Sequence, residues 1–226
     1  MKYNIRKYIL SGITVILAAA VLTACGGNKP EKDDTVQSTQ EIFAMDTYMS
    51  LTAYGSNSEE AVSKAVQEIN RLDAMFSVGN EDSDVTKINE NGSGEVSEET
   101  AFIMNRAMQV SKETKGAFDI TIYPVMELWG FTTKNYKVPQ VDELQETLKR
   151  VSYENVSLKD HELVLKNNAQ IDFGGIAKGY TSSRVMQIFK EYGIEHGMVN
   201  LGGNVQTLGT KTDGTASVSY THLRAH

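Results

Sequence analysis

A glycine-rich turn between Asp172 and Lys178 carries residue types suited to holding a phosphate group. Gly174 and Gly175 lie in this turn, and a predicted helix begins near Ala177. Glycines let a backbone approach a ligand closely, and the amides and partial positive charge of a helix N-terminus attract anions. The turn therefore predicts a phosphate or pyrophosphate site, although neither G-x-G-x-x-G nor the P-loop fingerprint fits it. A tight turn with a surface lysine is the alternative interpretation.

Three further segments place side chains at turns that could face a ligand. Residues 116–121 follow the predicted end of a helix and place the Asp119 carboxylate among apolar neighbours. Residues 44–47 predict a bend that contains Met45, and residues 200–204 predict another glycine turn. Each of these patterns is also typical of a plain turn, and an Asp in such a place is most often a cap or turn residue.

Composition and charge restrict the class of protein. The chain has 226 residues, of which 40% are hydrophobic and 23% are charged, as in an ordinary globular protein of one or two domains. Its net charge of −7 argues against a nucleic-acid partner, because nucleic acids bind to basic surfaces. Cys25 is the single cysteine, which excludes an internal disulfide and a cysteine-based zinc site.

Residues 1–24 are predicted to be a lipoprotein signal peptide. Basic residues precede an apolar run over residues 9–22, which is short for a bilayer core about 30 Å thick. Small residues before Cys25 resemble the bacterial lipoprotein box, which predicts lipidation of that thiol with diacylglycerol. An N-terminal membrane anchor with an incidental cysteine is the alternative. With lipidation, we expect a flexible tether over residues 25–39 and a protein anchored on the extracytoplasmic face of the cell membrane.

Helices and strands must position these turns, and their predicted order indicates an α+β fold with a mixed sheet core and flanking helices. Helices are expected over residues 56–76, 97–116, 142–150 and 177–192. Strands are expected over residues 41–54, 119–122, 155–158, 163–165, 169–173 and 197–201, with a hairpin turn at residues 159–162. The domain is predicted over residues 40–216, and residues 217–226, which match none of this patterning, are predicted to be a non-native tail.

Four segments together resemble the ApbE-like family of FAD:protein FMN transferases. They are AMDTYM from residue 44, GAFDITIYPVMELWGF from residue 116, IDFGGIAKGY from residue 171 and VNLGGNVQTLG from residue 199, in the order and near the spacing of the family. The resemblance implies an ApbE-like, T-fold-related domain. It also implies transfer of FMN from FAD to a Thr or Ser hydroxyl of a partner protein, release of AMP, and Mg²⁺ at the FAD diphosphate.

The resemblance also implies roles for individual residues. The implied FAD contacts are Met45, Ala117, Phe118, Asp119, Asp172 and Lys178, and the implied Mg²⁺ ligand is the backbone carbonyl of Gly175. Gly79 stands where many members have an aromatic residue, and Ser183 stands where an Asp is common. The resemblance assigns no general base, and Asp119 and Asp172 are the candidates for that role.

The function expected from this resemblance is an exported, lipid-anchored flavin transferase. Its acceptors would be membrane redox subunits of the Rnf or Nqr type, or other extracytoplasmic flavoproteins. A non-catalytic FAD-binding lipoprotein and a Mg²⁺-dependent FAD pyrophosphatase are the alternatives. The later family segments, with a His-containing motif and with Asp and Thr metal ligands, have no counterpart here, so we expect the 226-residue chain to be inactive as a transferase.

Overall fold

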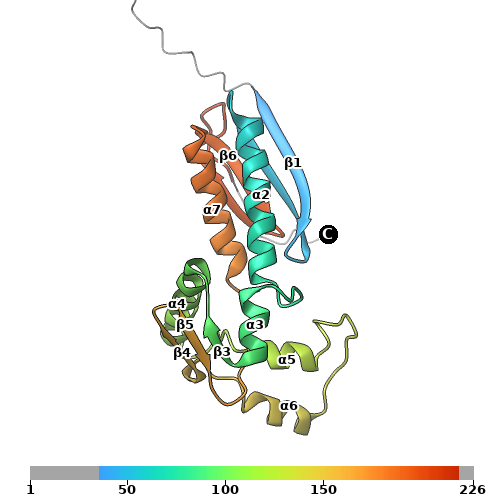
Figure 1. Cartoon of the computed structure of the whole chain (residues 1–226). Helices are drawn as coiled ribbons and strands as arrows, with labels where there is room; N and C mark the ends of the chain where they lie inside the picture. Colours follow the sequence, from blue (N-terminus) through green and yellow to red (C-terminus); the bar gives the residue numbers. More distant parts are fainter. Residues whose placement is uncertain (1–35, 219–226) are drawn as a thin grey trace, which may run out of the picture. The chain divides into compact units, whose positions relative to one another are not determined.

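The computed structural model describes residues 36–218, which form two antiparallel sheets and the helices around them (Figure 1). The four-stranded sheet has the order β1 (Gln37–Ala44), β2 (Thr47–Tyr54), β6 (His196–Leu201) and β7 (Asn204–Leu208). The three-stranded sheet has the order β3 (Ser93–Glu95), β5 (Glu162–Leu165) and β4 (Val156–Lys159). The helices are α2 (Ser58–Phe76), α3 (Asp84–Asn91), α4 (Glu98–Glu113), α5 (Tyr123–Leu128), α6 (Val141–Leu148) and α7 (Ala177–Glu191), with a 3-10 turn, η1 (Tyr153–Asn155).

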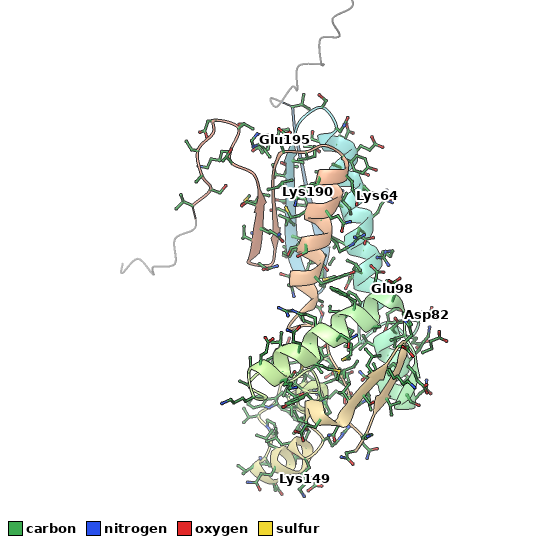
Figure 2. All side chains as sticks on the ribbon, turned by 90° about the vertical axis from the view of Figure 1, so that its left-hand side faces the viewer. Lys64, Asp82, Glu98, Lys149, Lys190 and Glu195 are labelled. Atoms are coloured by element: carbon green, nitrogen blue, oxygen red, sulfur yellow. The ribbon has the colours of Figure 1, made fainter. Side chains whose placement is uncertain are left out.

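Helices α2 and α7 lie side by side on one face of the four-stranded sheet (Figures 1 and 2). Side chains alternate between the two faces of a strand, so Met49, Leu51 and Ala53 of β2 all point into the core under these helices. The side chain of Tyr48, on the opposite face, is 80% exposed.

Helix α2 belongs to two hydrophobic cores. Its first part, including Ile69, packs in the core of the four-stranded sheet. Its last turn, with Leu72 and Phe76, packs in a second core with α3, α4 and the three-stranded sheet. Because one continuous helix serves both cores, its C-terminal end lies where they meet, and that junction holds the site described below.

The α+β class is confirmed, but the sheets differ from the predicted mixed core. Every strand pair of the two sheets is antiparallel. Within residues 36–218, parallel pairing is limited to an isolated bridge between Ile122 and Gln170. The predicted strands at residues 119–122 and 169–173 are therefore not strands. The hairpin at residues 159–162 is confirmed, with Lys159 paired to Glu162.

The predicted single strand at residues 41–54 is a hairpin of β1 and β2. Met45 and Asp46 form its turn and both adopt left-handed backbone conformations, with φ of +48° and +56°. The bend predicted at residues 44–47 is this turn, but a two-residue hairpin turn usually carries Asn or Gly, so the residue types did not show that the strand is divided in two. Strand β1 begins at Gln37, so residues 37–39 of the predicted tether are strand.

The helix boundaries lie close to the predicted ones, and caps define several of them. Ser97 caps α4, since its side chain accepts a hydrogen bond from the Thr100 amide at 3.2 Å, and Gly116 follows the helix with φ of +80°. Helix α2, predicted from residue 56, begins at Ser58, with Asn57 as its N-cap and without a side-chain cap hydrogen bond. Helices α3 and α5 and strands β3 and β7 were not predicted.

The chain from residue 169 to residue 173 crosses the second core outside both sheets, and a side chain replaces the missing strand partner. The Asn89 side chain donates to the Ile171 carbonyl at 2.8 Å and accepts from the Ile171 amide at 2.7 Å. The Asp172 amide donates to the Ile120 carbonyl at 3.1 Å. These bonds satisfy backbone groups of a fully buried residue and fix where the next residue, Asp172, leaves the core.

No helix within residues 36–218 is long and apolar enough to cross a bilayer. The predicted signal peptide at residues 1–24, the lipidation site at Cys25 and residues 219–226 of the predicted tail lie outside the described part of the chain.

We expect Asn89→Ala to lower the free energy of unfolding by about 2–4 kcal/mol, because two buried backbone groups lose partners worth about 1–3 kcal/mol each. Urea denaturation would measure this change. Glu90→Ala, at the exposed neighbouring position of the same helix, is the control and should change stability little. Equal stability of the two variants would show that the Asn89 bonds do not hold this segment.

Candidate functional site

A cleft opens where the β1–β2 turn, the end of α2 and the start of α7 meet. Its walls include Met45 and Asp46 from the turn, together with Asp172, Gly174 and Lys178 from the glycine turn and α7. Its volume of about 110 Å³ is below the roughly 300–1,000 Å³ of typical small-molecule sites. The cleft is therefore large enough for one part of a dinucleotide but not for a whole one.

The structure brings together most of the residues that the sequence analysis singled out. Met45, Asp172 and Lys178 line the cleft. Gly175 lies beside it with the Phe118 ring against its backbone, since a Cβ on Gly175 would come within 2.9 Å of Phe118 Cε2. The glycine is thus required for the close approach of these two segments.

Asp119 and Ala117 are not among the residues that line this cleft. The Asp119 carboxylate accepts hydrogen bonds from the amide and hydroxyl of Thr121, at 2.9 and 2.7 Å, and from the Tyr153 amide at 2.8 Å. This geometry fits the alternative interpretation of Asp119 as a turn residue. Contact of Asp119 or Ala117 with FAD stays a prediction.

The first and fourth motifs meet at the same end of the four-stranded sheet. The Gly202 amide donates to the Tyr48 carbonyl at 3.2 Å, and a Cβ on Gly202 would lie 2.3 Å from Thr47 Oγ1. The Asn204 side chain then donates to the Lys178 carbonyl at 3.2 Å. The turn of the fourth motif is therefore packed against the first motif and tied to the first turn of α7.

Met45 carries backbone strain at the mouth of the cleft. A non-glycine residue with positive φ is uncommon, and such strain collects at ligand sites, where the surrounding structure holds it. Thr181 Oγ1 lies 3.8 Å from Met45 Sδ, and Met45 packs against both cores. Contacts on α7 and in both cores thus hold the turn in place.

The start of α7 has the features of an anion-binding helix N-terminus. Its N-cap residue, Ile176, makes no side-chain cap hydrogen bond, and the first turn contains no acidic residue. The Ala177 amide already donates to the Phe173 carbonyl at 2.7 Å, so the amides of the next residues are the ones that could bind an anion, and the dipole favours negative charge there. Lys178 adds a full positive charge in the same turn, so this end of α7 suits a phosphate group.

Asp172 lines the same cleft as Lys178. Burial raises the pKa of its carboxyl group above the ordinary value, against the hydrogen bond from the Gly174 amide at 2.7 Å and the charge of Lys178, which both lower it. A buried carboxylate with a raised pKa at a cleft is the pattern of a group that exchanges protons.

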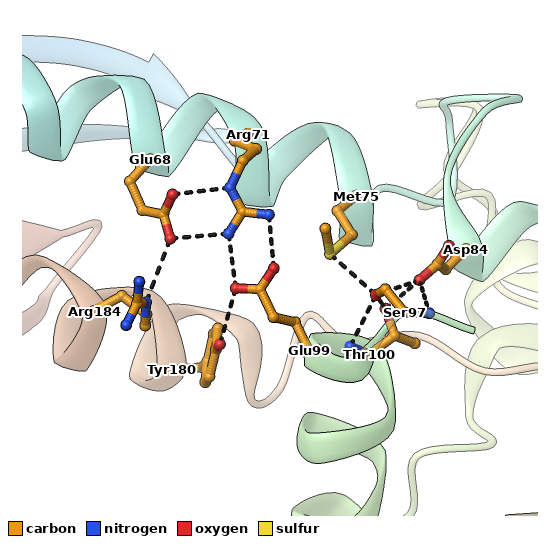
Figure 3. A network of polar contacts seen from close by, with 9 residues as sticks. All are labelled: Glu68, Arg71, Met75, Asp84, Ser97, Glu99, Thr100, Tyr180 and Arg184. Carbon is orange, nitrogen blue, oxygen red and sulfur yellow. Dashed lines mark hydrogen bonds and ion pairs between the residues drawn. The ribbon is translucent and has the colours of Figure 1, made fainter. Parts of the chain in front are cut away.

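A network of ion pairs braces the first turn of α7 against α2 and α4 (Figure 3). Arg71 makes two hydrogen bonds to Glu68, at 2.8 and 2.9 Å, and two to Glu99, at 2.7 Å each. The Tyr180 hydroxyl donates to Glu99 at 3.2 Å, and Arg184 Nε donates to Glu68 at 3.3 Å. Hydrogen bonds from Arg71 lower the pKa of both glutamates, so the network is charged at neutral pH.

Sequence reasoning missed this network because its members come from three helices far apart in the chain. The spacing of Glu68 and Arg71 suggests only a local pair on one helix. Nothing in the sequence signals that Glu99, 28 residues further along, completes the bidentate contact.

The sequence profile of the ApbE family matches residues 45–222. The chain belongs to the ApbE family. This confirms the predicted family, and the match takes in residues 217–222 of the predicted tail. The ApbE protein of Thermotoga maritima has a solved structure with a TM-score of 0.76 at 34% identity, covering 80% of this chain and 61% of that one. The flavin transferase ApbE of Vibrio cholerae gives 0.74 at 23% identity, which shows the shared fold.

Two relatives share the ApbE sequence over much of this chain. The FAD:protein FMN transferase of Haemophilus influenzae is 27% identical over 92% of this chain and 63% of its own length. The one of Vibrio cholerae is 30% identical over 68% of this chain and 49% of its own length. The chain therefore spans about half to two thirds of the length of these ApbE relatives.

Two positions where the sequence departs from the expected ApbE pattern are exposed. Gly79 is exposed and follows the cleft residue Val78, so no aromatic ring is offered there. Ser183 is exposed on α7, and its hydroxyl donates to the Gly179 carbonyl at 3.1 Å. Its side chain is thus engaged along its own helix.

The described residues do not by themselves make a magnesium site. Within residues 36–218 no group of three or more His, Cys, Asp and Glu side chains is placed to hold a metal ion. Mg²⁺ requires about six oxygen ligands in a near-octahedral arrangement, of which the Gly175 carbonyl would be one. That role of Gly175 stays a prediction.

We expect Asp172→Asn to be at least as stable as the wild type at pH 7. The folded-state pKa of Asp172 is raised above the unfolded value, so stability falls as pH rises through the window between the two. Asparagine removes this ionisation and can still accept from the Gly174 amide. The gain should shrink as pH falls below the unfolded pKa, about 3.9. Thermal melts across pH would measure it.

Asp119→Asn is the matched control for this pH series. An amide has one acceptor oxygen, so it cannot accept all three of the hydrogen bonds that the Asp119 carboxylate accepts, and the variant should be less stable at pH 7. A destabilised Asp172→Asn variant, or a stability difference that does not change with pH, would contradict our assignment of burial as the dominant effect on Asp172.

Proposed function

We propose that this ApbE-family protein binds FAD at the cleft and transfers its FMN half to a Thr or Ser hydroxyl of a partner protein, releasing AMP. The observation that carries the proposal is the convergence of Met45, Asp172 and Lys178 on one cleft at the open N-terminus of α7. Two relatives bear the name FAD:protein FMN transferase, which supports this reaction. The proposal concerns the protein as a whole, since the chain spans only part of those relatives.

The proposed reaction makes one bond and breaks another at the FMN-side phosphorus. The acceptor oxygen attacks that phosphorus, the bond to the bridging oxygen breaks, and AMP leaves while the hydroxyl proton passes to a base. Such phosphoryl chemistry depends mainly on positioning and on stabilising charge on the phosphate oxygens. Lys178 and the first amides of α7 would supply positive charge to these oxygens.

Asp172 is the better of the two candidates for the base. Its carboxylate lines the cleft, and the pKa of this group, raised by burial, makes it a stronger base than an ordinary carboxylate. The carboxylate of Asp119 is instead committed to three hydrogen bonds within the protein. When bound, Mg²⁺ would neutralise charge on the diphosphate, and the Gly175 carbonyl is its proposed ligand.

The proposed cellular setting follows from residues 1–39. Lipidation at Cys25 would anchor the protein on the extracytoplasmic face of the cell membrane. Acceptors on the same face, such as Rnf or Nqr type subunits or other extracytoplasmic flavoproteins, would then be within reach. The apolar run that ends before Cys25 supports this proposal.

We expect Lys178→Met to weaken FAD binding by about 10–100-fold, the loss associated with a hydrogen bond to a charged group. Equilibrium dialysis of the chain with FAD, and with NAD and ATP for comparison, would measure this. Lys190→Met is the matched control, because Lys190 is exposed in the last turn of the same helix (Figure 2). Tighter binding of NAD or ATP than of FAD, or equal losses in both variants, would reject the proposed site.

We expect Cys25→Ala to remove the protein from the membrane fraction or to leave it as an unprocessed precursor, because the thiol that receives the lipid is absent. Cell fractionation combined with intact-mass measurement would decide between these two outcomes and show the mass of the lipid on the wild type. If the variant is processed and fractionates like the wild type, Cys25 is not a lipidation site.

A further inference from the structure

The segment after α5 presents aromatic side chains to solvent. We call residues 129–138 the aromatic loop. Phe131 is 54% exposed and Tyr136 is 66% exposed. Their rings pack edge to face with centroids 5.7 Å apart, and Phe131 also stacks on Trp129 at 6.5 Å. Exposed apolar groups gathered in one place mark interaction surfaces, and aromatic residues are enriched there.

The aromatic loop has a defined conformation. The Lys137 amide donates to the Trp129 carbonyl at 3.1 Å and closes the base of the loop. Gly130 has φ of +78°, and a Cβ at this position would lie 1.9 Å from the Asn135 carbonyl oxygen. Only glycine permits this closure, so the rings are presented in a fixed arrangement, which reduces the entropy lost when a partner binds.

The loop borders the cleft. Lys134 Nζ lies 4.0 Å from Asp46 Oδ1, and Asp46 is in the wall of the cleft beside Met45. Both side chains are largely exposed, so this contact adds little stability. It shows that the loop lies next to the wall of the cleft. A molecule seated on the aromatic loop would therefore lie next to the place where the proposed reaction occurs.

We propose that the aromatic loop is the docking surface for the acceptor polypeptide, through a segment of that polypeptide with apolar and acidic side chains. The inference rests on the proposed function, which requires an acceptor chain to approach the cleft. The rings would pack against apolar side chains, while Lys134 and Lys137, in a loop without acidic residues, complement carboxylates.

A polypeptide fits these observations better than a small molecule does. Small ligands are held in concave sites that bury about 70–90% of their surface. Phe131 and Tyr136 instead lie on a loop and have more than half of their surface in solvent. Such a surface suits a broad partner that covers several side chains at once.

The test is a fluorescence anisotropy titration of the whole chain with labelled peptides. One short peptide is rich in Asp and Leu with a single Thr, and a second has Lys in place of Asp. The variants are Phe131→Ala and Lys137→Glu. Their matched controls are Phe102→Ala, an exposed aromatic position on α4, and Lys159→Glu, an exposed lysine on β4. Equilibrium dialysis with FAD is run on every variant, and thermal melts confirm folding.

The wild type should prefer the acidic peptide. Phe131→Ala should weaken its binding by about tenfold, as for a central aromatic contact. Lys137→Glu should reduce or reverse the preference for the acidic peptide. This variant tests the docking surface independently if Phe131→Ala disturbs the loop. The controls should leave peptide binding unchanged, and all four variants should bind FAD like the wild type.

Three outcomes would overturn the docking surface. Equal binding of the two peptides by the wild type removes the proposed charge complementarity. Loss of FAD affinity in Phe131→Ala would assign the loop to the nucleotide. Binding of phosphatidylglycerol vesicles that is lost in both loop variants, without peptide binding, would make it a membrane contact. A wild type that binds the acidic peptide as expected but binds no FAD would reject the proposed function alone.

Discussion

The backbone of residues 169–173, with Ala169, Ile171 and Phe173 buried, is the constraint on which the candidate site depends. Ile171 and Phe173 are anchored in the second core, yet their segment has no strand on either side apart from one bridge at Gln170. Buried amides and carbonyls must be paired, and here the Asn89 side chain supplies the pairing that a neighbouring strand would otherwise give. This arrangement frees the next residues from sheet geometry, so that Asp172 can enter the cleft and the glycines can turn into α7.

The first turn of α7 is held from two sides and left open at its end. On one side Tyr180 reaches Glu99 in the ion-pair network, and on the other the Asn204 side chain holds the Lys178 carbonyl. The pairs around Arg71 are partly exposed, so their value lies in fixing geometry more than in net stability. A helix end fixed in this way has no side-chain cap that would compete with an anion, and of its first amides the one of Ala177 is already bonded to the Phe173 carbonyl.

Local signals predicted the regular elements well and the irregular ones poorly. The 3.6-residue periodicity of α2, α4 and α7 and the cap at Ser97 depend on neighbours in the chain, so the sequence alone is sufficient for them. Residues 169–173 have the apolar character of a strand because they are buried, but their partner is a side chain that no local pattern reveals.

The candidate site was predictable only in part for the same reason. Motifs singled out Met45, Asp172 and Lys178, and the structure places all three on the cleft. Asp73 and Phe76, which also line it, are ordinary helical positions in the sequence and become wall residues only because α2 ends there. Convergence of this kind is a property of tertiary packing and is absent from any single segment.

The division of α2 between two cores has a consequence for how the molecule loses its structure. Ile69 anchors one core and Leu72, less than one helical turn away, anchors the other, and a helix cannot easily melt in one half while the other stays packed. Loss of packing in either core would therefore disturb the packing of α2 in the other. We expect the two cores to unfold as one cooperative unit instead of as separate foldons. Widening of the cleft at their junction would therefore disturb the packing of α2 in both cores.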